Sequence, residues 1–337
     1  MVRKVQKGRS TTDERSIKVT RTNLDVFIPC LIIREMSLKR ILITGATGKQ
    51  GGALLSALLN SPPSPPFHLV ALTRNKNSVS AQALAKKPNV SILQGDLNDC
   101  DAIFKSSPEP FHGVFSVQVP LRPRVEEQQG KALADAAVVH GVRHFVYTSA
   151  DRGGAAQSDR GPTAIKHFAS KFNIETHLKA VCKESGDKMK WTIIRPVAFM
   201  ENLTPDFLGR AFATMWKLNE PNSKLQLVSS TDIGILAADI FKNPEVYTGC
   251  SLSLATDEMT FQEANEIFKQ VVGIDMPTTY PLVGRLIKFL LYEQLGAMFN
   301  WFREVGFGAD PKEFRDKYPQ MQDFERWLRQ SSGFKTG

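Results

Sequence analysis

The chain has 337 residues, of which 42% are hydrophobic, and its 43 Lys and Arg against 34 Asp and Glu give a net charge of +9. This composition suffices for one large α/β domain or two smaller ones and gives no indication of disorder across the main body. Residues 1–40 carry ten basic and four acidic side chains, which leaves 33 basic and 30 acidic residues in a near-neutral body. We therefore expect no direct binding of nucleic acid by the folded part.

Residues 1–36 are basic and rich in hydroxyl groups, and we expect a disordered extension there. A mitochondrial transit peptide and a start of translation at Met36 stay open as alternatives. The apolar run 26–33 is too short to span a bilayer, so no membrane segment is predicted.

The cysteines show neither metal-ligand spacing nor the density of a disulfide scaffold. This indicates reduced thiols in a cytoplasmic protein, with a nuclear location also open, and no metal site. The four cysteines are Cys30, Cys100, Cys182 and Cys250.

A short apolar strand, Ile41 to Ile43, runs into a glycine-rich turn and then into a helix with an apolar face. Gly45 suits the backbone angles of a tight turn, Gly48 leaves space for phosphate oxygens, and Gly51 lets helix and strand pack closely. Because free N–H groups at the helix start attract an anion, the pattern predicts a dinucleotide pyrophosphate site. An ordinary strand-to-helix turn is the alternative. The expected cofactor contacts in the turn are Gly45, Thr47, Gly48, Lys49, Gln50 and Gly51.

The next predicted strand, residues 68–74, ends in Arg74. An NAD site places an acid for the ribose 2′-hydroxyl at this point, about twenty residues past the glycines. A guanidinium is a bidentate phosphate ligand, so Arg74 indicates the 2′-phosphate of NADP, and Lys49 and Lys76 can add charge to the same pocket. A solvated arginine at a strand end is the alternative.

Strand and helix patterns then alternate, which predicts an α/β fold with a doubly wound parallel Rossmann sheet. The expected strands are 89–94, 113–117, 144–149 and 191–195, and the main helices are 124–140 and 163–183. Beyond Pro196 the alternation stops, and mostly helical segments follow at 206–218, 237–243, 261–272, 282–301, 311–315 and 321–330.

These patterns divide the chain into an extension (1–36), an NADP-binding Rossmann domain (37–203) and a smaller helix-rich C-terminal region for substrate or partner (204–337). Ligands of doubly wound proteins lie outside the carboxyl ends of the strands, where this region would cover the cofactor. The apolar stretch 282–302 can line a pocket, form a dimer face or belong to the core.

His167 and Lys171 lie one turn apart on the helix 163–183. Short-chain dehydrogenases carry a catalytic Tyr and Lys at this spacing, and here a histidine takes the tyrosine position. Imidazole titrates near neutrality and can donate a proton, although a packed histidine is the alternative. Lys171 can instead pair with Glu175 on the helix surface. Ser149, at a strand end, takes the place of the serine that polarises a carbonyl, with a turn hydroxyl as the alternative.

Together these motifs resemble the NmrA-like family, an atypical branch of the short-chain dehydrogenase/reductase superfamily, from about residue 38 to 328. The resemblance rests on residues 45–51, Thr73-Arg74, Gly95-Asp96-Leu97, Tyr147-Thr148-Ser149, His167-Phe168, Ser170-Lys171, Ile174-Glu175, Arg195-Pro196 and Phe199-Met200-Glu201-Asn202. It implies that Asp96 and Leu97 flank the adenine and that Lys171 reaches the nicotinamide ribose. It also implies that Pro196 to Phe199 lie beside the nicotinamide.

Some relatives of this kind sense the NADP(H) state and pass it to a transcription factor or another protein, whereas others reduce small substrates. We predict an NADP(H)-binding protein that reduces a small, largely apolar metabolite, with Lys171 as cofactor ligand and His167 or Ser149 nearest the substrate. The alternative is a non-enzymatic redox sensor that binds a regulatory protein. Either form is expected as a monomer or homodimer.

Overall fold

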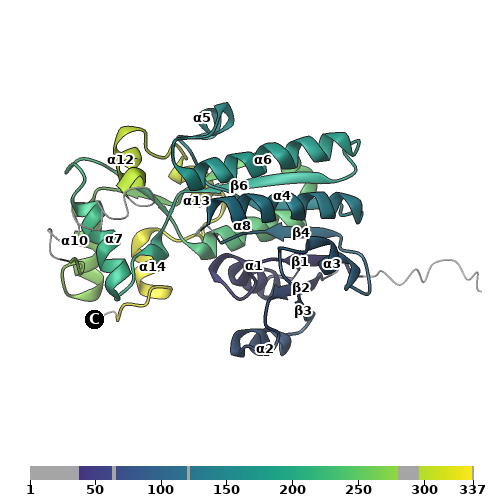
Figure 1. The fold of residues 1–337 in the computed structure, drawn as a ribbon. Coiled ribbons are helices and arrows are strands. Elements are labelled where there is room, and N and C mark those ends of the chain that lie inside the picture. Colours follow the sequence, from purple (N-terminus) through teal and green to yellow (C-terminus); the bar gives the residue numbers. More distant parts are fainter. Residues whose placement is uncertain (1–37, 63–65, 120–121, 280–295, 336–337) are drawn as a thin grey trace, which may run out of the picture. The chain divides into compact units, whose positions relative to one another are not determined.

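The computed structural model describes residues 38–62, 66–119, 122–279 and 296–335. The predictions for residues 1–36, and those for most of the stretch 282–302, lie outside these ranges. Within them, seven parallel strands form one sheet in the order β3-β2-β1-β4-β5-β6-β9, which confirms the doubly wound Rossmann prediction (Figure 1). The strands are β1 (Arg40–Ile43), β2 (His68–Thr73), β3 (Val90–Gln94), β4 (Gly113–Ser116), β5 (His144–Thr148), β6 (Lys190–Pro196) and β9 (Ser251–Leu254).

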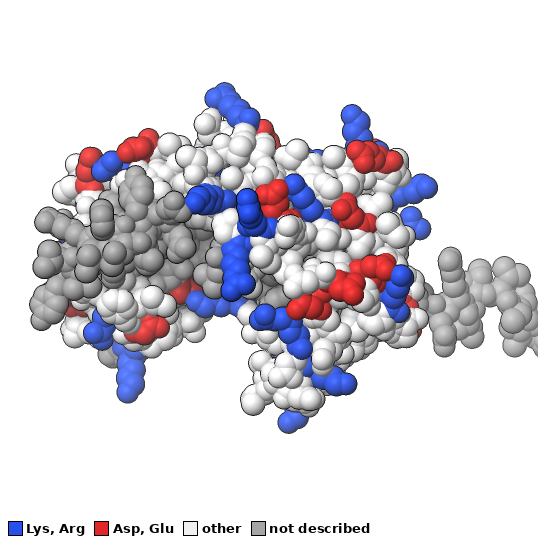
Figure 2. All heavy atoms as spheres, in the orientation of Figure 1, with Lys and Arg blue, Asp and Glu red and all other residues white. Residues whose placement is uncertain are grey.

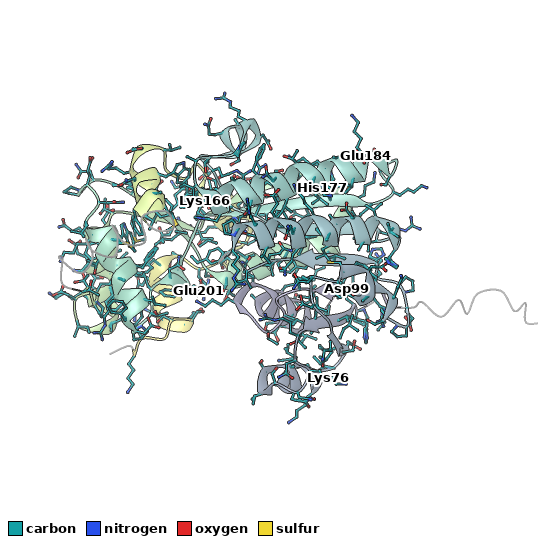
Figure 3. The ribbon with its side chains drawn as sticks, in the orientation of Figure 1. Lys76, Asp99, Lys166, His177, Glu184 and Glu201 are labelled. Carbon is teal, nitrogen blue, oxygen red and sulfur yellow. The ribbon has the colours of Figure 1, made fainter. Side chains whose placement is uncertain are left out.

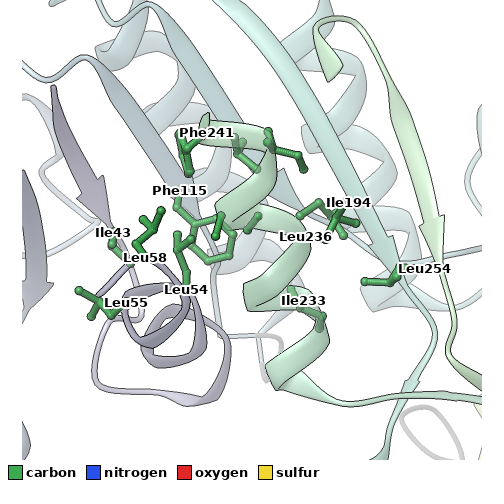
Figure 4. Packing of buried hydrophobic residues seen from close by; sticks show 14 of the residues in the cluster. Ile43, Leu54, Leu55, Leu58, Phe115, Ile194, Ile233, Leu236, Phe241 and Leu254 are labelled. Carbon is green, nitrogen blue, oxygen red and sulfur yellow. The ribbon is translucent and has the colours of Figure 1, made fainter. Parts of the chain in front are cut away.

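Helices cover both faces of this sheet because its strands are apolar on both sides. Ile41 and Ile43 of β1 pack in one cluster with α1 and α8, whereas Leu42 between them packs in a second cluster with α3, α4 and α6. Figure 4 shows the first cluster, in which side chains of α1 and α8 meet strand residues such as Phe115 and Ile194. The helices are α1 (Lys49–Asn60), α2 (Val79–Ala85), α3 (Cys100–Lys105), α4 (Pro123–Val139), α6 (Lys166–Glu184) and α8 (Ser230–Lys242).

The prediction that the alternation stops beyond Pro196 is wrong for two elements. Helix α8 begins at Ser230 rather than at residue 237, and β9 pairs with β6 as a seventh strand of the main sheet. Strand β9 was missed because the apolar pattern from Ser251 to Leu254 is too short to distinguish a strand from a loop. The short helix α5 (Ala155–Arg160), which precedes α6, also carries no helical periodicity in the sequence.

The C-terminal region has its own core beyond one end of the sheet (Figure 1). Helix α10 has the predicted bounds, and α7, α13 and α14 agree with the predictions within a few residues. Phe299, Trp301 and Phe302 are buried in this core, and Trp301 also lines a cavity, so the described part of the stretch 282–302 belongs to the core and, at Trp301, to a pocket wall. The remaining elements are β7 (Ala198–Phe199), η1 (Met200–Asn202), α7 (Phe207–Lys217), β8 (Leu225–Val228), α9 (Pro244–Tyr247), β10 (Asp257–Met259), α10 (Phe261–Val272), α12 (Ala297–Glu304), α13 (Pro311–Lys317) and α14 (Phe324–Gln330).

A buried carboxylate joins the sheet to the C-terminal region. Asp151, just after β5, accepts hydrogen bonds from the amides of Gly153 and Gly154, and from the hydroxyl of Ser253 on β9. Its fourth donor is the amide of Gly308, at 3.0 Å. Four donors compensate for the removal of this charge from water.

Helices α1 and α8 approach closely enough that only a glycine fits between them. A Cβ built on Gly234 of α8 lies 2.5 Å from the carbonyl carbon of Ala53 on α1. We expect Gly234→Ala to lower the free energy of unfolding by about 1–3 kcal/mol, the usual cost of overpacking a core. Urea denaturation of the two proteins measures the difference.

Gly52→Ala is the matched control, since a Cβ on Gly52 of α1 meets only Ala46 O at an ordinary 3.5 Å. Alanine has the higher helix propensity, so this variant should be as stable as the wild type or more stable. Equal stability of the Gly234 and Gly52 variants would contradict the close helix contact.

Candidate functional site

The glycine turn has the geometry that the sequence predicted. Gly45 has a φ of +59°, and a Cβ on Gly51 would lie 2.5 Å from the carbonyl oxygen of Gly45. Thr47, Gly48 and Lys49 are exposed, and no side chain caps the start of α1. The turn therefore presents backbone N–H groups in an open cradle that a side chain at Gly51 would distort, and this arrangement fits a pyrophosphate.

The turn lies at the point where the strand order reverses. Strand β1 has β2 on one side and β4 on the other, which is the usual ligand position in doubly wound sheets. Thr44 after β1 exchanges two hydrogen bonds with the backbone of Val117 after β4, at 2.7 and 2.8 Å. This exchange fixes the two strand ends that flank the expected dinucleotide.

The side chains of Gln50 and Lys49 tie the turn to other elements. Gln50 accepts a hydrogen bond from Thr148 at the end of β5, at 2.7 Å. Lys49 donates to the carbonyl oxygen of Glu201 in η1, at 2.9 Å. Lys49 is thus engaged with η1, and the expectation that it adds charge beside Arg74 does not match this contact.

Arg74 follows β2 directly, is exposed, and has no hydrogen bond or ion pair with any described residue. The loop after it is anchored, because the Lys76 amide donates to Gln94 and the Lys76 carbonyl accepts from Gln82. In Figure 2, Lys and Arg side chains gather in a band from the N-terminal end of α6 towards β2. Arg74 is therefore held on a fixed loop with its guanidinium available to an anion.

The predicted neighbours of the adenine and of the nicotinamide lie at strand ends. Asp96, shortly after β3, is exposed and accepts from the Asn98 amide, while Leu97 packs partly against the core. Pro196 ends β6 and is buried, and Phe199 in β7 is half-buried.

Ser149 belongs to a buried ionic network centred on Glu175 of α6. The carboxylate of Glu175 accepts from the Ser149 hydroxyl, from Arg152 at 2.9 Å and from Arg195 at 2.6 Å. Burial alone would raise the pKa of Glu175, but hydrogen bonds from Arg195 and the nearby charge of Arg152 hold it below its ordinary value. Since the Ser149 proton is donated to Glu175, the hydroxyl is held as part of this network.

The alternative of a surface pair between Lys171 and Glu175 is wrong, because the two arginines occupy Glu175. Lys171 instead donates to Glu126 in the first turn of α4, at 2.8 Å, and Ser170 donates to the other oxygen of Glu126 at 2.9 Å. The Glu126 side chain is fully buried and that of Lys171 is 11% exposed. Lys171 is thus held by a neighbouring helix instead of lying free on the surface.

His167 lies in the first turn of α6, at the end that Figure 3 marks by Lys166, with Glu184 at the far end. Burial, reinforced by the charge of Lys171, lowers the pKa of His167 to about 4. At neutral pH about one ring in a thousand is then protonated. An imidazolium at His167 is therefore scarce under physiological conditions.

Three polar groups near these residues were missed from the sequence. Glu126 accepts a hydrogen bond from Lys171, and Arg152 donates one to Ser149. Gln118 is buried after β4, and its Oε1 has no partner among the described residues. Gln118 follows a strand end just as Ser149 does, so the same reasoning would have found it. No sequence spacing reveals Glu126, which lies 45 residues from its partner.

Among the cavities in the described part of the chain, two have walls from elements near the expected site. The larger, about 770 Å³, runs along the outer sides of α1 and α8 and includes Lys49 but none of the predicted catalytic residues. The smaller, about 400 Å³, lies between α5, the segment 161–164 and α12.

No three His, Cys, Asp or Glu side chains of the described ranges form a metal-binding group. The helices within the described ranges are too short or too polar to cross a membrane.

A model of the NmrA-like family matches residues 37–328. A similar protein is the NmrA-like family domain-containing oxidoreductase ptmS of Penicillium ochrochloron, 27% identical, with 70% of this chain and 73% of that protein covered. The nitrogen metabolite repression protein nmr of Neurospora crassa is also 27% identical, with 80% and 60% covered.

Among solved structures, NmrA, a negative transcriptional regulator, in complex with NADP has a TM-score of 0.65 at 20% identity. The match covers 88% of this chain and 95% of that one. The same regulator in complex with NAD gives the same TM-score. These likenesses confirm the fold.

Two histidines, the buried His144 and the partly buried His167, make the stability of the fold dependent on pH. The pKa values of His167 and His144 are both lowered to about 4, whereas an unfolded chain takes up these protons near 6.5. Between about pH 6.5 and 4 the unfolded state binds more protons, so stability falls as the pH falls. Asp232, whose pKa burial raises to about 6, acts in the opposite direction.

The wild type should lose stability between pH 7 and pH 5. We expect this loss to be smaller by about 1–2 kcal/mol in His167→Gln, because glutamine takes up no proton. Urea unfolding of both proteins at the two pH values isolates the contribution of this one ring. An identical pH dependence of wild type and variant would show that His167 is solvated in the fold.

Proposed function

The chain belongs to the NmrA-like family, and on that premise we propose that it binds NADP(H) and reduces a small, largely apolar metabolite. The observation that carries the cofactor choice is Arg74, an exposed guanidinium without a partner among the described residues, at the end of β2. A 2′-phosphate is the ligand that such a group takes up, and NAD lacks it.

The glycine turn fits the pyrophosphate, since Gly48 and Lys49 are exposed at the uncapped start of α1 and a Cβ at Gly51 would press on the backbone of Gly45 in the turn. Arg74 would hold the 2′-phosphate, Asp96 and Leu97 would flank the adenine, and Lys171 would hold the nicotinamide ribose. Phe199 and Pro196 would form the wall beside the nicotinamide. When bound, the reduced nicotinamide supplies a hydride.

The chain's own contribution is binding and orientation more than proton transfer. His167 is neutral at physiological pH, and the hydroxyl of Ser149 donates to Glu175. Neither group is then a ready acid, so the proton that accompanies the hydride would come from water. His167 keeps the role of the polar group nearest the substrate.

A second candidate function is a redox sensor that passes the NADP(H) state to a transcription factor or another protein. The observation that favours it is that Ser149 and Lys171 are both held by buried carboxylates, those of Glu175 and Glu126. Such a sensor has no need of a free acid. We propose a cytoplasmic protein, or one also present in the nucleus for the sensor, as a monomer or homodimer.

Arg74→Gln tests the cofactor. Loss of a charge-assisted contact with the 2′-phosphate should weaken NADPH binding about 10- to 150-fold, equivalent to about 1.5–3 kcal/mol, and leave NADH binding unchanged. Titration of both cofactors by fluorescence measures the two affinities. Lys76→Gln, on the same loop, is the control and should have a smaller effect, because a lysine makes no bidentate contact. Equal losses for NADPH and NADH would show that Arg74 does not bind the 2′-phosphate.

NADPH oxidation with a panel of quinones and carbonyl compounds tests the reaction. We expect His167→Gln to lower kcat less than about 10-fold, well below the 10²–10⁴-fold usual for loss of a general acid. Lys171→Met should weaken NADPH binding about 10-fold, because its proposed contact exists in the ground state. A hundredfold loss of kcat in His167→Gln at unchanged NADPH affinity would restore His167 as proton donor.

The same panel separates the enzyme from the sensor. A sensor should oxidise NADPH with none of the compounds and should bind its partner with different affinity in the NADP and NADPH forms. Equal partner affinity in both forms would exclude the sensor, since a ligand without differential binding cannot shift an equilibrium.

A further inference from the structure

The smaller cavity, of about 400 Å³, has two arginines in its lining. Its walls include Arg152, Arg160, Gln157 and Trp301, together with Val305 and the segment 161–164. None of these lining residues, all within the described part of the chain, is acidic. The volume falls in the range of small-molecule sites.

The two arginines of the cavity have different surroundings. The terminal nitrogens of Arg152 are used by Glu175, Ser149 and two backbone carbonyls, and its Nε has no partner in the described ranges. Arg160 is exposed at the end of α5, and within the described ranges its guanidinium hydrogen-bonds only to Gln157, a neutral side chain, at 3.3 Å. The charge of Arg152 is thus compensated inside the protein, whereas Arg160 offers an uncompensated guanidinium.

Short chains of contacts connect the cavity to the candidate catalytic residues. Arg152 lies 3.3 Å from the hydroxyl of Ser149. On the other side, Trp301 meets Phe168 edge to face at 5.0 Å, and Phe168 meets His167 at 4.5 Å between ring centroids. One side chain, Arg152, thus separates the cavity from Ser149, and two side chains, Trp301 and Phe168, separate it from His167.

We propose that this cavity receives the carboxylate end of an aromatic substrate, with Arg160 as the anion-binding group and Trp301 as the apolar wall. The inference that the occupant is a substrate rests on the proposed reduction. A guanidinium pairs with a carboxylate in two parallel hydrogen bonds, and an indole packs well against an aromatic ring. The proposed substrate of the reduction is then more specific than a small apolar metabolite. It is a flat apolar compound that carries one anionic group.

The test compares 2-naphthoate with its neutral analogue 2-naphthylmethanol on the NADP-loaded protein, by isothermal titration calorimetry. We expect naphthoate to bind at least about 10-fold more tightly. Arg160→Gln should abolish this preference without affecting folding, because Arg160 is exposed. Arg143→Gln, which removes an exposed arginine before the amino end of β5, should leave the preference intact.

Equal affinities of the two compounds in the wild type, or a preference that survives Arg160→Gln, would overturn the proposal. NADPH oxidation with 6-formyl-2-naphthoate and with its methyl ester then tests the link to the reaction. The free acid should have the higher kcat/KM, and Arg160→Gln should remove the difference. If the binding preference depends on Arg160 but neither aldehyde is reduced, the anion pocket stands and the reduction of such substrates is overturned.

Discussion

The convergence of two guanidinium groups on the carboxylate of Glu175 is the interaction on which the carboxyl edge of the sheet depends. Arg152 and Arg195 are both fully buried, and arginine stays charged under all conditions in which a protein folds. Arg195 also pairs with Asp159 at 2.6 Å, but without Glu175 the buried Arg152 would have no carboxylate partner among the described residues, and breaking a buried pair of this kind costs about 3–5 kcal/mol. This carboxylate and its two arginines link the ends of β5 and β6 to α5 and α6.

The edge of the sheet uses two different kinds of polar chemistry. On the side of α1, the glycine turn offers backbone amides and an uncapped helix start, and no charge is buried there. On the side of α6, buried carboxylates hold each cation, with Glu126 against Lys171 and Glu175 against the arginines. A ligand across this edge would thus meet bare dipoles at one end and compensated charges at the other. Fixed dipoles and fixed ion pairs both require little rearrangement when a ligand arrives.

Local features of this fold could be predicted from the sequence, and partnerships across the fold could not. Three glycines at fixed spacing between a strand and a helix define the turn within a few residues, so Gly45 and Gly51 were assigned correctly. The partner of Lys171 lies on another helix, and the neighbouring Glu175 gave the wrong pair because sequence spacing contains no information about Arg195 on β6. The environment of His167 could not be predicted from the sequence either. The ordinary pKa of histidine suggested a proton donor, but burial in the fold lowers the pKa of this ring to about 4.

The four-donor site of Asp151 has a consequence for how the chain acquires its structure during synthesis. Its donors come from residues 153, 154, 253 and 308, so the last of them is added more than 150 positions after the carboxylate itself. Domains generally form as the ribosome delivers them, and contacts of long sequence separation form late. In a nascent chain that ends before Gly308, the Asp151 carboxylate therefore lacks one of its four hydrogen-bond donors. The central strands of the sheet beside it have by then already been synthesised. Premature termination that removes the last thirty residues, Gly308 included, would leave this edge of the sheet incomplete, although every described strand had been translated.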